Sequence, residues 1–112
     1  MQLKYGKSLD VLKQTVIDNI NEAAYAKITA EYPIWKQLNN NSRVIALLLT
    51  NTLTQEEQEE LVILRKSYIY IEAVKALSNT LSNEITNITC PTQLRQFEQD
   101  ALMQLENFAE LT

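Results

Sequence analysis

The 112-residue sequence contains no histidine, one glycine, two prolines and one cysteine. Without histidine, neither a Ser-His-Asp triad nor a Cys-His pair can form, and the Glu-x-x-His motifs of di-metal helical bundles are excluded as well. A single glycine cannot build a phosphate-binding glycine loop, and a single cysteine excludes a disulfide within the chain. We therefore predict that the protein is not an enzyme and that it has no catalytic residue, metal site or cofactor.

Long apolar runs and a basic bias are absent too. No apolar stretch approaches the roughly 18 residues that cross a membrane, and residues 1–7 lack the basic-then-apolar pattern of a signal peptide. The net charge of −4 leaves no cluster of Lys and Arg for a phosphate backbone. We expect a soluble chain made in a cytoplasm, with no membrane contact and no direct nucleic-acid binding.

The scarcity of turn-forming residues, together with 46% hydrophobic residues, favours a few long helices over many short strands. A chain of this length suffices for one modest core. The sequence therefore predicts an all-α protein in which residues 1–112 form a single helical domain. We expect about four helices, arranged as an antiparallel bundle or as paired hairpins.

Apolar residues spaced three and four apart define the expected helices. Three of them run from about Leu9 to Glu31, from Ile34 to Thr50 and from Thr92 to Leu111. The first should end at Tyr32, because the residue before a proline is biased away from helical geometry. The second has a weak stretch at residues 39–42, where Asn and Ser side chains compete for the backbone and a kink is allowed. Its apolar face consists of Ile34, Trp35, Leu38, Ile45, Leu48 and Leu49.

One long helix, over about residues 54–88, dominates the chain. Thr54 and Glu57 form a capping box at its start. Its apolar positions are Leu61, Leu64, Tyr68, Ile71, Val74, Leu77, Leu81, Ile85 and Ile88. At about 1.5 Å per residue the helix would be on the order of 50 Å long, more than the diameter of a compact domain of this size. We therefore expect part of it to pack on another chain, with an early end near Ser82 as the competing interpretation.

The apolar stripe of this helix changes phase after Ile71, as in a coiled-coil stammer, so one uniform seam is not expected. We predict that its N-terminal half packs inside the bundle and its C-terminal half packs against something else. The candidate interchain residues are Trp35, Ile63, Ile69, Tyr70, Leu77 and Leu81. For Trp35, burial in the core is the preferred interpretation and an exposed interface the alternative.

Charge is unevenly distributed, since residues 53–112 hold four cations and ten acids, a balance of −6. A candidate acidic surface consists of Glu56, Glu59, Glu98 and Asp100. The glutamates of residues 56–60 resemble a metal cluster, but acids in a first helical turn are favoured by the helix dipole alone.

Three segments carry a resemblance to a known family. They are Tyr32-Pro33-Ile34-Trp35-Lys36-Gln37-Leu38-Asn39, then Leu53-Thr54-Gln55-Glu56-Glu57-Gln58-Glu59-Glu60-Leu61, and Ile71-Glu72-Ala73-Val74-Lys75-Ala76-Leu77-Ser78-Asn79. In this order, over about residues 23–85, they resemble small bacteriophage proteins encoded around tail-fibre genes. The resemblance implies a phage origin and a role in virion tails or their assembly, which would place the chain in the host cytoplasm or the virion. It implies no catalytic residue.

Two functions follow as hypotheses. The first is a non-enzymatic phage protein that works by helix packing, as a tail-associated component or assembly factor, forming a homo-oligomer and binding a phage or host protein. The alternative is a phage-encoded inhibitor of a host defence system, of the anti-CRISPR type, whose acidic surface meets a basic nucleic-acid channel.

Overall fold

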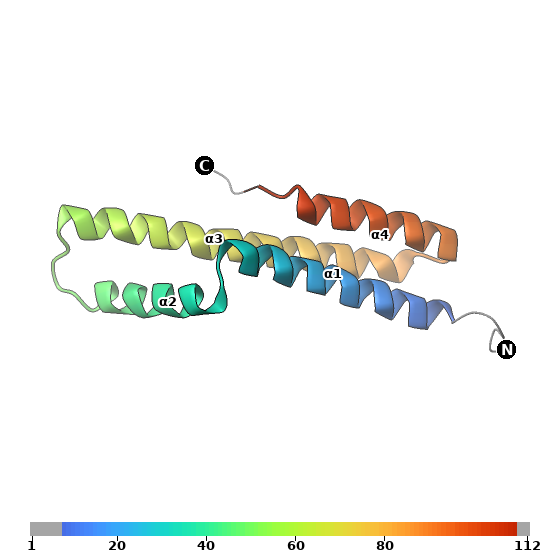
Figure 1. Cartoon of the computed structure of the whole chain (residues 1–112), viewed down its shortest axis with the longest axis horizontal. Helices are drawn as coiled ribbons and strands as arrows, with labels where there is room; N and C mark the ends of the chain where they lie inside the picture. Colours follow the sequence, from blue (N-terminus) through green and yellow to red (C-terminus); the bar gives the residue numbers. More distant parts are fainter. Residues whose placement is uncertain (1–7, 110–112) are drawn as a thin grey trace.

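The computed structural model describes residues 8–109, and this part of the chain is helical with no strand. Four α-helices follow one another, α1 (Leu9–Glu31), α2 (Ile34–Leu48), α3 (Gln55–Glu84) and α4 (Pro91–Glu106), with a short 3₁₀ helix η1 (Ile85–Asn87) before α4. Figure 1 shows them packed against one another along one long axis. The prediction of an all-α fold with about four helices and one long helix is confirmed.

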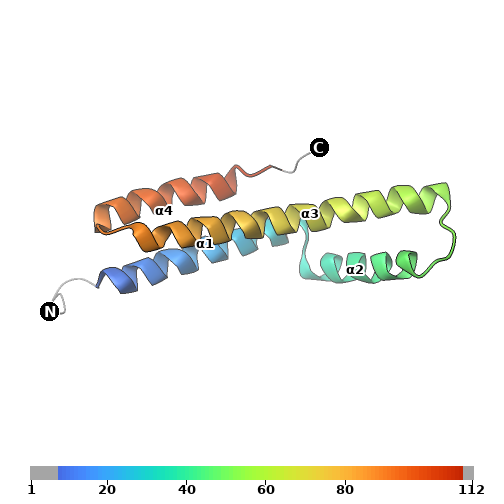
Figure 2. The ribbon, with the colours of Figure 1, turned by 180° about the vertical axis from the view of Figure 1, so that it is seen from behind.

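The long helix α3 is the spine of the molecule, which measures 66 × 23 × 21 Å. Figures 1 and 2 show α1 and α2 following one another along α3, both antiparallel to it, with α4 returning beside the end that α1 covers. The molecule therefore has two unlike ends. A three-helix part combines α1, α4 and the C-terminal half of α3, and a two-helix hairpin combines α2 with the N-terminal half of α3.

Sequence signals account for the helix boundaries. The Ser8 hydroxyl accepts a hydrogen bond from the Val11 amide at the start of α1, and Tyr32 ends α1 before Pro33, as predicted. The Gln37 side-chain amide donates to the Tyr32 carbonyl at 2.7 Å, which satisfies a carbonyl at the end of α1. The chain thus steps from α1 to α2 without a long loop.

The capping box of α3 is present in both directions, between Thr54 and Glu57. Helix α3 passes Ser82 without interruption and continues into η1, and α2 is unbroken at residues 39–42. Helix α4 ends at Glu106, whose carbonyl accepts a hydrogen bond from Lys27 Nζ at 2.8 Å. This helix was predicted to continue to about Leu111, but it ends earlier, because residues 107–109 are already non-helical; Leu111 itself lies outside the described residues.

The hydrophobic core lies in the three-helix part. It consists of Val16, Ile20, Ala24, Ile28, Tyr70, Val74, Leu81, Ile85, Leu94, Ala101 and Leu105. Tyr70 marks its inner end, with Tyr32 from the end of α1 and Phe108 from beyond α4 both at 5.6 Å between ring centroids. Beyond this aromatic group neither α1 nor α4 accompanies α3.

The structure reverses the prediction for the two halves of α3. The C-terminal half is the one inside the bundle, and among the helices of residues 8–109 the N-terminal half packs on α2. Small residues explain the preference, because they let two neighbouring helices approach α3 closely. Ser78, for example, is buried, and its hydroxyl donates to Asn21 Oδ1 of α1 at 3.0 Å.

Candidate protein-interaction surface

Exposed apolar side chains gather on the hairpin. Of the thirteen large hydrophobic residues that are exposed within residues 8–109, ten lie between Ile34 and Ile69. In the same stretch, Leu47 is the one hydrophobic residue that is buried. Clusters of exposed apolar residues on soluble proteins commonly mark interaction sites. The hairpin is therefore the candidate functional region.

Helix α2 presents a regular stripe on this surface. We call the α2 seam the set Ile34, Leu38, Asn41, Ile45 and Leu48, all of which are exposed. Their spacing of four, three, four and three residues is the heptad pattern of helices that pack in coiled coils. The central Asn41 is the only polar member of the seam, and helix α2 contains no acidic residue. Such an isolated Asn fixes register in coiled coils at a cost in stability.

A groove of about 350 Å³ runs beside the seam, between the two helices of the hairpin. Its lining residues are Asn40, Asn41, Val44 and Leu48 from α2, with Leu61, Leu64, Arg65, Ser67 and Tyr68 from α3. Tyr68 is exposed here, although its place in the apolar stripe predicted a core position. The apolar groove residues adjoin the leucines and isoleucines of the α2 seam. Together they form a surface on which another helix can lie.

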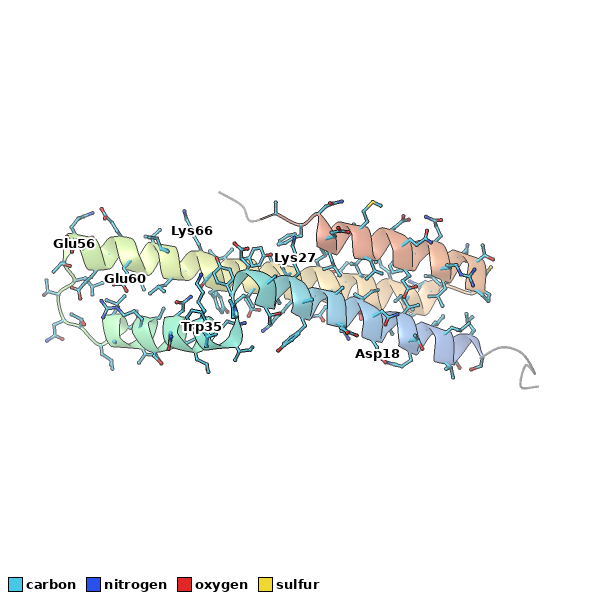
Figure 3. All side chains as sticks on the ribbon, viewed as in Figure 1. Asp18, Lys27, Trp35, Glu56, Glu60 and Lys66 are labelled. Carbon is cyan, nitrogen blue, oxygen red and sulfur yellow. The ribbon has the colours of Figure 1, made fainter. Side chains whose placement is uncertain are left out.

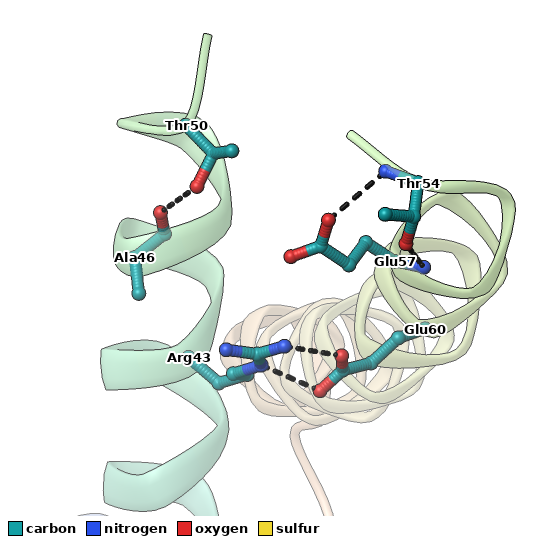
Figure 4. Close-up of polar contacts among 6 residues, drawn as sticks. All are labelled: Arg43, Ala46, Thr50, Thr54, Glu57 and Glu60. Carbon is teal, nitrogen blue, oxygen red and sulfur yellow. Dashed lines mark hydrogen bonds and ion pairs between the residues drawn. The ribbon is translucent and has the colours of Figure 1, made fainter. Parts of the chain in front are cut away.

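An exposed ion pair joins the two helices of the hairpin. The Arg43 guanidinium donates two hydrogen bonds to the Glu60 carboxylate, at 2.7 and 2.8 Å (Figure 4). These bonds lower the pKa of Glu60 and raise that of Arg43. The bidentate geometry favours one register of α2 against α3, and Figure 3 shows Glu60 on the side of α3 that faces α2.

The opposite side of α3 bears a second surface. We call the α3 stripe the set Glu59, Val62, Ile63, Lys66 and Ile69, all of which are exposed. In Figure 3 Lys66 points away from α2. Tyr70 lies on the same helical face, four residues after Lys66 and seven after Ile63, and it is covered by Phe108. The α3 stripe therefore lies on the same face of α3 that Phe108 covers at Tyr70.

The six predicted interchain residues separate into two groups. Trp35, Ile63 and Ile69 are 65%, 66% and 55% exposed, so the core position preferred for Trp35 is wrong, and its role in an interface stays a prediction. Tyr70 and Leu81 are buried in the core of the same chain, and Leu77 is half-buried against it. These three were misplaced because the C-terminal half of α3 is covered by α1 and α4.

Sequence reasoning did not name Leu38, Ile45 and Leu48 as interface candidates, although it placed them on the apolar face of the second helix. The structure turns this face to solvent. A signal was available in the regular heptad spacing, with Asn41 interrupting it, since a polar residue at a central position is unusual on a buried face.

The four candidate acidic residues do not form one surface. Glu56 lies at the tip of the hairpin, as Figure 3 shows, and Glu59 is one turn further along α3. Glu98 and Asp100 belong to α4 in the three-helix part, where Glu98 accepts a hydrogen bond from Asn19 of α1. The acids are thus divided between the two ends of the molecule.

Other candidate chemistry is sparse in the described part of the chain. Backbone N–H groups of Gln93 and Thr92 lower the pKa of the half-buried Cys90 thiol, which is the ordinary effect of a helix N-terminus. Residues 8–109 hold no group of three or more Cys, Asp and Glu side chains placed to bind a metal ion. Nor does any helix in this range combine the length and apolar content needed to cross a membrane.

Comparison with protein-family models, curated proteins and solved structures finds no match to this chain.

Proposed function

We propose that the chain is a non-enzymatic bacteriophage protein that acts by protein–protein interaction, as a tail-associated structural component or an assembly factor. Its interaction element is the hairpin, which binds an amphipathic helix of another phage protein along the α2 seam and the adjoining groove. The observation that supports this is the regular heptad row on α2. This row is exposed, and no segment of residues 8–109 covers it. Heptad rows are stable in water when a second helix covers them.

The chemistry of the surface specifies the partner. The α2 seam is uncharged, so the partner helix must offer apolar residues at the same three-and-four spacing. Arg65 lines the groove, and none of the groove residues is acidic. A partner helix with a carboxylate beside its apolar row would therefore be complementary to Arg65, whereas a basic helix would be disfavoured.

The phage setting rests on the resemblance of residues about 23–85 to small proteins encoded around tail-fibre genes. The most distinctive segment of that resemblance, Tyr32 to Asn39, forms the turn into α2 and supplies Ile34 and Leu38 to the seam. The resembling residues and the exposed surface therefore coincide, as expected if the segment is used for binding.

The test is site-specific photo-crosslinking in infected host cells, with the photoreactive amino acid placed at Leu38 or Ile45 in the full chain. Tyr25, an exposed aromatic residue of α1, is the matched control position. We expect cross-links from the seam to one helical segment of a tail or tail-assembly protein, and few from the control. The purified partner should then bind the wild-type chain at least about tenfold more tightly than the Leu38→Asp, Ile45→Asp double variant.

Two results would refute the proposal. One is a cross-linking pattern at Leu38 and Ile45 that is no different from the pattern at Tyr25. The other is a partner whose affinity is unchanged in the double variant. Both substituted positions are exposed, so circular dichroism should show that the variant keeps its helical content.

The alternative function, inhibition of a host defence complex of the anti-CRISPR type, required one continuous acidic surface. Because the predicted acids lie at opposite ends of the molecule, we prefer the packing proposal. Salt separates the two: binding through the apolar seam should persist at high ionic strength, and binding to a basic channel should weaken steeply.

A further inference from the structure

We infer that the α3 stripe pairs with the α3 stripe of a second copy of this chain, in an antiparallel arrangement about a two-fold axis between Val62 and Ile63. This surface is on the side of α3 opposite to α2, so it is distinct from the surface used in the proposed function. Three observations lead to it: the charges of the stripe, the length of uncovered helix, and the apolar residues at its centre.

The charges of the stripe are complementary to themselves. Glu59 and Lys66 lie at equal distances on either side of the point between Val62 and Ile63, about 5 Å along the helix axis in each direction. An antiparallel copy centred on this point places each Glu59 opposite the Lys66 of the other copy, twice by symmetry. A parallel copy would instead place like charges opposite each other, which is unfavourable.

The length of uncovered helix agrees with the same centre. Helix α3 begins at Gln55, and Tyr70 is the first position where Tyr32 and Phe108 cover it. On the side of α3 opposite to α2, the stretch that no described residue covers is therefore residues 55–69, and its midpoint is Val62. In the antiparallel pair, the tip of each hairpin reaches the Tyr70 region of the other copy. The second copy would then cover α3 on the face that Phe108 covers at Tyr70, from that point toward the tip of the hairpin.

The centre of the stripe provides the apolar contact. Val62, Ile63 and Ile69 are all more than half exposed in the single chain, and the aliphatic stem of Lys66 lies among them on the helix surface. One helix pair buries less surface area than a typical stable interface. We therefore expect a weak dimer with a dissociation constant of roughly micromolar or higher. The association must therefore be measured over a wide concentration range.

The test is sedimentation equilibrium on the full chain, comparing wild type with Glu59→Lys, Lys66→Glu and the variant that carries both substitutions. We expect the wild-type mass to rise from monomer toward dimer with concentration. Each single variant should weaken the dimer by about tenfold, because two attractive pairs become repulsive. The double variant restores opposite charges at every contact and should return to near the wild-type dissociation constant.

Asp100 is an exposed residue of α4, away from the stripe. Asp100→Lys makes the same charge change as Glu59→Lys and should leave the dissociation constant of the dimer unchanged. A chain that is monomeric at every concentration would overturn the inference. A dissociation constant that is the same in wild type and both single variants, or that does not recover in the double variant, would overturn the proposed antiparallel register. None of these variants touches the α2 seam, so either result leaves the photo-crosslinking test of the proposed function unaffected.

Discussion

The three-helix part has a buried core and the hairpin has an exposed apolar surface, so the same substitution should lower the free energy of unfolding by very different amounts in the two parts. Ile20 in α1 is 0% exposed and belongs to the core, whereas Ile45 in α2 is 59% exposed and belongs to the α2 seam. Both lie in helix interiors, so replacing either by alanine makes the same chemical change. The difference in stability between Ile20→Ala and Ile45→Ala therefore measures burial.

The expected magnitudes follow from the carbon atoms removed. Ile→Ala deletes three carbons, worth about 2.4 kcal/mol at about 0.8 kcal/mol per buried group. The cavity left at Ile20 adds to this, so we expect a loss of about 3–4 kcal/mol. That is a large part of the roughly 6–17 kcal/mol expected for a chain of this length. At Ile45 the smaller burial is partly offset by the higher helix propensity of alanine, and the change should stay within about 1 kcal/mol.

The assay is urea denaturation followed by far-UV circular dichroism, at a protein concentration where light scattering shows a monomer. Ile20→Ala should lower the urea midpoint strongly, and Ile45→Ala should barely move it. Equal losses in the two variants would refute the reasoning, because they would mean that α2 packs its outer face within the same chain. An unchanged midpoint for Ile20→Ala would refute the assignment of the core.

Two further predictions concern the polar contacts of the hairpin. Thr54→Ala removes the capping box of α3 and should cost about 1 kcal/mol in urea denaturation, while Thr52→Ala, outside the helix, should cost little. The hydrogen bonds from Arg43 keep the pKa of Glu60 below its ordinary value of 4.5, so their contribution to stability is present above that pH and is lost as the pH falls through the lower folded-state pKa. Arg43→Gln should therefore be less stable than wild type at neutral pH, with the difference shrinking in acid, and a difference that does not vary with pH would contradict this.

Local sequence signals predicted the helices closely, but they could not predict what covers each helix. Ser8, Pro33 and the Thr54–Glu57 box act within a few residues of their own position, so the boundaries of α1 and the start of α3 follow from sequence alone. The apolar face of α2 is different. Periodicity shows which residues share a face, and the same pattern arises whether that face meets the chain's own core or another protein.

The error over the two halves of α3 has the same physical origin. Leu61 and Leu64 repeat at core spacing as convincingly as Val74 and Leu81, and the decision between them depends on where α1 and α4 lie. That placement is set by core packing between residues distant in the sequence, and it also brings Lys27 to the end of α4 and Asn21 to Ser78. Contacts between distant residues leave little trace in a single sequence, so the exposed half of the helix could not be identified without the structure.

The continuity of α3 explains how a hairpin with so little core can present a binding surface. Isolated helices of about 12–15 residues are marginal in water, and α2 with the first half of α3 buries only Leu47 among its hydrophobic residues. The first half of α3, however, is the same uninterrupted helix whose second half is anchored in the core. The costly nucleation of helix has therefore already occurred there, and Arg43 fixes α2 to this preformed helix through Glu60. A partner that covers the hairpin meets an ordered surface, so less of its binding energy is lost to ordering than with a flexible segment.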